Sequence, residues 1–167
     1  MFQVSGMPTH AEQRILPYTP EQMFDLVADV EKYPQFLPWC SACRIRKREG
    51  NVILADLAIG YKMLKEKFTS RVDLQRPHHI RVDYLDGPLK HLSNTWDFYP
   101  TDDGGCLIDF YVDFEFRSRI LQRLMEMFFN EAVKRMVTAF ETRAGEIYGP
   151  AGPQDSVSST ASSHSNP

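Results

Sequence analysis

The sequence has no run of about 18 apolar residues, the length that a helix needs to cross a bilayer, so it predicts no membrane-spanning helix. Cysteine is scarce, with 3 among 167 residues, and the first residues lack the basic and apolar regions of a secretory signal. We therefore expect a cytoplasmic protein with reduced thiols. Acidic and basic residues nearly balance at a net charge of −3, which argues against DNA as a partner.

The sequence also lacks the short motifs that mark common active sites. It contains no Ser nucleophile elbow, no glycine-rich phosphate loop and no HExxH motif. Most acidic residues fall at strand positions that should face water, and Glu66 is an exception because it is in phase with Leu64 and Phe68. We favour an ion pair of Glu66 with Arg81 or Lys90 over a role as general acid. The sequence thus predicts no catalytic residue and no enzyme activity.

Two of the cysteines lie in the segment WCSAC, which is similar to a redox motif. In thioredoxin-like sites such a pair opens a helix, whose N-terminus lowers the thiol pKa. Here the segment runs into RIRKR, which alternates like a strand, so we favour Cys43 as a small inward residue beside Ile45, with a redox pair as the alternative. A zinc site would need two further ligands. Because His78, His79 and Cys106 have no recognisable spacing for one, we predict no metal.

What the sequence does contain is a strong periodic pattern. Residues 10–16 predict a strand, and residues 18–30 predict a helix that begins with a capping box at Thr19. The period then changes to two, and residues 43–116 predict six strands joined by turns. Residues 118–148 return to the helical period without a proline, which predicts one long helix.

This order of elements predicts an α+β fold. Since the connections within the sheet all read as hairpins, we expect a curved antiparallel sheet of about seven strands wrapped around the long C-terminal helix. The folded domain should span residues 8–148. Residues 149–167 are rich in Ser, Pro and Gly with almost nothing apolar, which predicts a disordered tail.

Two features of the pattern have more than one interpretation. A solvated sheet face is the ordinary explanation for a run of basic residues on strands, and contact with lipid headgroups or ribosomal RNA is the alternative. This basic strip comprises Arg44, Arg46, Arg48, Lys62, Lys65 and Lys67. The apolar faces favour a filled core by pattern alone, although methionines on the long helix are also suited to line a cavity for a flexible apolar ligand.

Several segments in their order resemble one known family. LPYTPEQMFDLVADVEKYPQFLPWC, EKFTSRV, GPLKHLSNTWDF and FYVDFEF are similar to the coenzyme Q-binding proteins of the START-like, polyketide cyclase-related superfamily. The resemblance covers about residues 8–148 and implies a helix-grip fold, in which the sheet and the last helix enclose an apolar tunnel. It implies non-catalytic binding of ubiquinone or a similar isoprenoid lipid, in support of respiratory electron transport or quinone biosynthesis.

On this interpretation ubiquinone is a bound ligand and no cofactor is required. The inward positions that we expect to contact the lipid are Phe24, Leu57, Phe68, Val72, Trp96, Phe110, Phe114, Met125 and Phe128. A proline-stiffened aromatic lid, formed by Tyr33, Phe36 and Trp39, should cover the end of the sheet and could gate the lipid or touch a membrane.

The same resemblance leaves two rivals. One branch of the family is described as ribosome-association toxins, so a protein that binds a ribosomal subunit through the basic strip is the first. A cyclase or aromatase, as in related members of the superfamily, is the second. Only Glu66 and Asn94 suggest the polar pocket that such an enzyme would need. For the lipid-binding function, we expect a cytoplasmic protein that could also associate peripherally with the inner membrane.

Overall fold

The computed structural model describes residues 9–61 and 64–149. The predicted tail after residue 149 and the predicted domain start at residue 8 lie outside the described residues, as does Lys62 of the basic strip. The elements in chain order are β1 (Thr9–Leu16), α1 (Pro20–Ala28), the 3-10 helix η1 (Val30–Gln35), β2 (Cys40–Glu49), β3 (Val52–Tyr61), β4 (Leu64–Gln75), β5 (His79–Asp86), β6 (Leu89–Pro100), β7 (Cys106–Phe116) and α2 (Arg119–Tyr148).

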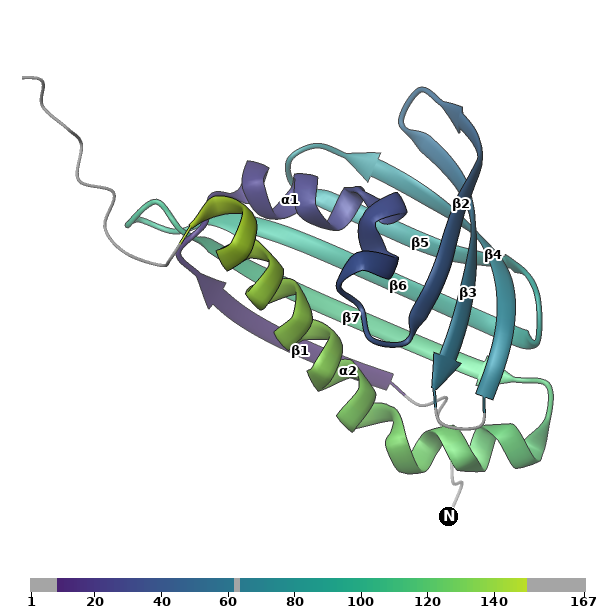
Figure 1. Ribbon diagram of the computed structural model, residues 1–167. Helices are drawn as coiled ribbons and strands as arrows, with labels where there is room; N and C mark the ends of the chain where they lie inside the picture. Colours follow the sequence, from purple (N-terminus) through teal and green to yellow (C-terminus); the bar gives the residue numbers. More distant parts are fainter. Residues whose placement is uncertain (1–8, 62–63, 150–167) are drawn as a thin grey trace, which may run out of the picture.

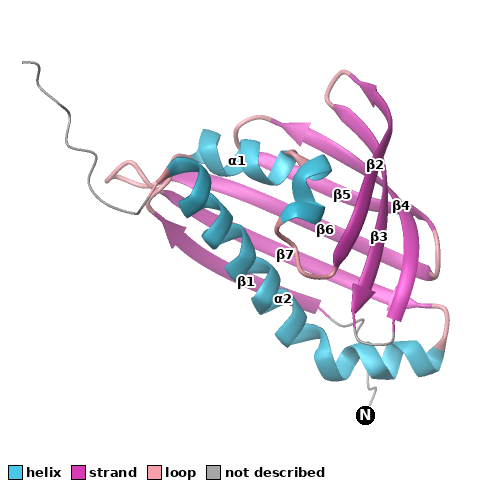
Figure 2. Ribbon diagram, in the orientation of Figure 1, coloured by secondary structure: helices cyan, strands magenta, loops and turns pink. Residues whose placement is uncertain are grey.

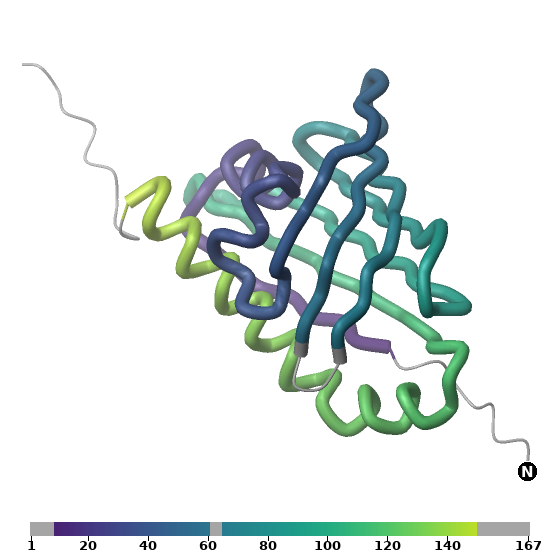
Figure 3. The backbone as a smooth tube through the Cα atoms, turned by 45° about the vertical axis from the view of Figure 1, so that its right-hand side comes forward, coloured from purple at the N-terminus to yellow at the C-terminus, as the bar shows by residue number. Residues whose placement is uncertain are grey.

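The strands of the described residues form a single seven-stranded antiparallel sheet in the order β1-β7-β6-β5-β4-β3-β2. The sheet is strongly curved, so that β2, β3 and β4 stand steeply against β5, β6 and β7 (Figures 1 and 3). Helix α2 runs diagonally across the concave side, with α1 and η1 beside it (Figure 2). The predicted helix-grip fold is confirmed.

The start of α1 follows from the predicted capping box. Thr19 Oγ1 accepts a hydrogen bond from the backbone N–H of Gln22 (3.2 Å), and Gln22 Oε1 accepts one from the N–H of Thr19 (3.0 Å). The predicted single helix 18–30 is wrong at its end, because the α-helix stops at Ala28 and the separate 3-10 helix η1 follows. Pro34 within η1 has no N–H and its ring would collide with the preceding turn of an α-helix, which favours the short 3-10 turns.

Strand β7 has the most regular apolar face of the sheet. Its burial alternates as the sequence predicts, with the side chains at even positions from Cys106 to Phe116 buried and Asp109, Asp113 and Glu115 partly exposed. Helix α2 contributes Phe129, Val133, Val137, Phe140 and Ala144 to the same core. The N-terminal turns of α2 instead extend past the sheet, beside the ends of β3 and β4 (Figures 1 and 3).

Candidate ligand-binding cavity

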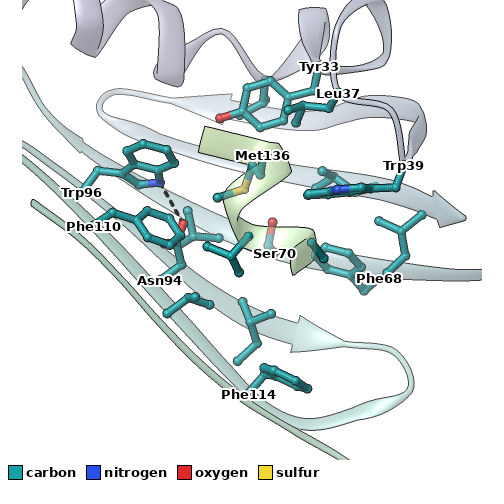
Figure 4. A pocket seen from close by; sticks show the side chains of 18 of the residues that line it. Tyr33, Leu37, Trp39, Phe68, Ser70, Asn94, Trp96, Phe110, Phe114 and Met136 are labelled. Carbon is teal, nitrogen blue, oxygen red and sulfur yellow. Dashed lines mark hydrogen bonds between the residues drawn. The ribbon is translucent and has the colours of Figure 1, made fainter. Parts of the chain in front are cut away.

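A cavity of about 240 Å³ lies between the concave face of the sheet and α2. Its walls come from both helices, η1 and the inward faces of β3 to β7, and Figure 4 shows the side chains directed into it. The volume is below the roughly 300–1,000 Å³ that encloses a drug-sized ligand. A head group or part of an apolar chain fits within it, and a long chain would extend beyond it.

The lining is apolar and uncharged among the residues that the structure describes. Its polar members are mostly paired within the wall. Trp96 Nε1 donates a hydrogen bond to Asn94 Oδ1 (2.9 Å), and Asn94 Nδ2 donates one to the carbonyl of Tyr111 (2.8 Å). The Tyr33 hydroxyl donates to the carbonyl of Val27, and burial raises the pKa of Tyr33, so this phenol stays neutral. A cavity of this kind favours apolar matter over ions.

Most of the residues that the sequence predicts as inward line this cavity. They are Leu57, Phe68, Val72, Trp96, Phe110, Phe114 and Met125. Trp96 lies among three aromatic rings, with centroid distances of 4.6 Å to Phe110, 5.2 Å to Phe140 and 6.4 Å to Phe98. Their contact with a lipid stays a prediction.

Phe24 and Phe128, which the sequence predicts as inward contacts of the lipid, do not line the cavity. Phe24 is buried on α1, but its ring packs edge-on against Phe98, at 5.9 Å between centroids, and Val27 one turn later reaches the cavity instead. On α2 the adjacent Phe129 lines the cavity instead of Phe128. The sequence did not distinguish the two, because apolar residues cover so much of the helix that its inward face is uncertain by one residue.

The predicted lid divides into two parts. Tyr33 and Trp39 line the cavity, together with the buried Leu37 between them (Figure 4). Phe36 lies outside it, where its ring packs edge-on against the rings of Tyr33 and Phe140 at 5.9 and 5.2 Å. Phe36 therefore anchors the segment to α2, and gating by the segment stays a prediction.

Some of the lining residues were missed by the sequence analysis. Ser70 sits between Phe68 and Val72 on β4, so strict alternation would have placed it inward. Phe140 belongs to the apolar stripe of α2 but was not singled out, and its ring reaches Trp96.

The cysteine pair has the properties of apolar core residues. Cys40 and Cys43 are free thiols, Cys40 is buried, and Cys43 packs against the core. Burial raises the pKa of both thiols, that of Cys43 to about 11. This shift is opposite to the one that activates a redox cysteine. Among the described residues, no group of three or more His, Cys, Asp or Glu side chains is arranged to hold a metal ion.

The predicted ion pair of Glu66 is wrong. Arg81 pairs with Asp83 at 3.0 Å, and Lys90 pairs with Glu115 at 3.5 Å. Glu66 is half-buried, belongs to none of the ion pairs between described residues and does not line the cavity. The described walls of the cavity therefore hold no carboxylate that could act as a general acid.

The sheet, the long helix across it and the apolar space between them define a START-like protein. Residues 16–141 match the family described as "Polyketide cyclase / dehydrase and lipid transport", and the chain belongs to that family. A solved START superfamily protein from Mycobacterium smegmatis has the same fold, with a TM-score of 0.74 at 17% identity over 85% of this chain and 99% of that chain. No helix among the described residues is both long and apolar enough to cross a membrane.

Two curated relatives are more similar in sequence. The chain is 39% identical to the mitochondrial coenzyme Q-binding protein COQ10 homolog B of Xenopus laevis, over 84% of this chain and 59% of that protein. It therefore spans well under two thirds of the frog protein. It is 40% identical to the ribosome association toxin RatA of Rickettsia prowazekii, over 80% of this chain and 94% of the toxin.

Proposed function

We propose that this protein binds ubiquinone or a similar isoprenoid lipid in the cavity without catalysis, and that it thereby supports respiratory electron transport or quinone biosynthesis. The observation that carries this proposal is the lining, which is apolar and holds no charged side chain among the described residues. The name of the frog relative, a coenzyme Q-binding protein, supports the choice of ligand.

The binding free energy comes from desolvation. Each CH₂ group that leaves water for an apolar wall contributes about 0.8 kcal/mol, so burial of an isoprenoid chain can drive binding without a charged anchor. The methionine side chains of Met125 and Met136 can adapt to branched chains of different shape. Cyclase chemistry would need an acid or base beside the substrate, and the described lining offers only neutral polar groups.

Native mass spectrometry and lipid extraction of protein purified from its own cells test this proposal. We expect a co-purified neutral isoprenoid lipid that carries a quinone ring. Protein that never yields an apolar ligand, and that binds no added short-chain ubiquinone, would contradict the proposal.

We propose further that the protein collects the lipid at a membrane surface, through the first turns of α2. Ile120, Leu124 and Met127 share one face there and are 81%, 37% and 75% exposed. Arg119 and Arg123 are exposed beside them. An exposed apolar face flanked by cations is suited to a bilayer that contains anionic lipid.

Substituting Ile120→Asp and Met127→Asp together should weaken binding to vesicles of phosphatidylcholine and cardiolipin by at least about tenfold, because both apolar side chains would no longer enter the interface. Ile15→Asp is the matched control, since Ile15 is 71% exposed on the edge strand β1. Vesicle co-sedimentation measures the effect. Equal loss in the control variant, or no loss in either, would show that this face does not dock.

Ribosome association is the second candidate function, favoured by the toxin that this chain matches over most of its length. Arg44 and Arg46 are exposed on β2, and Lys65 and Lys67 are exposed on β4. Arg46 is partly neutralised by an ion pair with Asp56. If this function holds, the protein should co-sediment with a ribosomal subunit, and Arg44→Glu with Arg46→Glu should abolish this. Sedimentation that is absent, or that survives the charge reversal, would count against it.

A further inference from the structure

Two polar atoms in the cavity wall have no hydrogen-bond partner among the described residues. They are the hydroxyl oxygen of Ser70 and the indole nitrogen of Trp39, and both are buried at the atom level. Ser70 is 0% exposed and is the one buried polar residue in the described part of the chain. The other polar groups of the wall, on Tyr33, Asn94 and Trp96, are paired with neighbours.

An unpaired buried donor costs folding free energy, so such atoms are uncommon in native proteins. Ser70 lies in the middle of β4, opposite the fully buried Ala55 of β3, where an alanine would fit without this cost. Trp39 is held just before β2, where its carbonyl accepts a hydrogen bond from the N–H of Gly60 (2.8 Å). Figure 4 shows the Ser70 hydroxyl and the Trp39 indole on the walls of the same cavity.

We propose that Ser70 and Trp39 form the head-group subsite of this cavity, each donating a hydrogen bond to an oxygen of the bound lipid. This inference rests on the proposed function and makes it more specific. Both side chains are neutral donors, and no described residue of the lining is a cation that could balance an anion. The subsite therefore selects carbonyl or ether oxygens, as on a quinone ring, over the phosphate of a polyprenyl phosphate.

The test measures the affinity of the full chain for three probes by calorimetry: a short-chain ubiquinone, the isoprenoid hydrocarbon squalene, and farnesyl phosphate. We expect Ser70→Ala and Trp39→Phe each to weaken ubiquinone binding by roughly tenfold and to leave squalene binding unchanged, because only the quinone loses a hydrogen bond. Farnesyl phosphate should bind the wild-type protein more weakly than the quinone. Ser41→Ala is the matched control, since Ser41 is exposed and its hydroxyl bonds to the carbonyl of Ala58 outside the cavity.

Thermal unfolding of the apo protein provides a second readout. Ser70→Ala should not lower the unfolding midpoint, because it removes an unpaired hydroxyl rather than a hydrogen bond. A variant that is less stable and binds the quinone as before would show that Ser70 holds only a structural water, which would overturn the subsite. Equal weakening of quinone and squalene would also overturn it, since the change would then act through cavity shape. A wild-type protein that binds neither the ubiquinone nor squalene would overturn the proposed function together with the subsite.

Discussion

Trp96→Ala is expected to weaken the binding of a short-chain ubiquinone by at least about tenfold and to lower the free energy of unfolding by about 3–5 kcal/mol. The indole forms part of the cavity wall, and its ring packs against Phe110 and Phe140. Its loss also removes the donor to Asn94 Oδ1. The variant thus loses both ligand contact and core packing.

Phe24→Ala separates these two effects. Phe24 is 2% exposed and packs on Phe98, but it does not line the cavity. It should lose comparable stability, and the folded fraction should keep its affinity for the quinone. Chemical denaturation gives the free energies of unfolding, and ligand titration at low temperature gives the affinity of the folded protein. If both variants lose stability and neither folded protein loses affinity, Trp96 is a core residue alone.

The fold was largely predictable because its signals are local. The alternation from Cys106 to Phe116 fixes which side of β7 is buried, and the capping box at Thr19 fixes where α1 begins. The sequence analysis missed a lining residue where two neighbouring residues fitted the same inward position of the periodic pattern. On α2 the adjacent Phe128 and Phe129 are equally apolar, and of the two Phe129 lines the cavity.

The cavity itself was not predictable from pattern. Alternation indicates which side chains face inward, but it does not indicate whether the side chains of the sheet and of α2 fill the space between them. In this protein side chains of the curved sheet, of α2 and of the segment from Tyr33 to Trp39 surround the space without filling it. The unpaired hydroxyl of Ser70 has no sequence signal either. Whether this hydroxyl finds a hydrogen-bond partner depends on which side chains surround it in the folded protein, and the alternation of β4 does not state that.

Ala132→Trp is expected to abolish lipid binding while the protein stays folded. Ala132 lies on α2 and lines the cavity, so an indole at this position projects into a space of only about 240 Å³. Because the side chain would fill a void rather than displace packed atoms, the free energy of unfolding should change by no more than about 1–3 kcal/mol. Titration with a short-chain ubiquinone should show affinity reduced by more than about a hundredfold.

Lys134→Trp is the control for this variant. Lys134 is exposed on the same helix and does not line the cavity, so an indole there should change neither the affinity nor the fold. Circular dichroism and thermal unfolding confirm that both variants are folded before affinities are compared. Because Ala132→Trp closes the cavity without adding or removing a charge, vesicle binding through Ile120 and Met127 should persist in it. A plugged protein that still binds the quinone would place the lipid site outside the cavity, since an apolar chain cannot occupy a space that the indole fills.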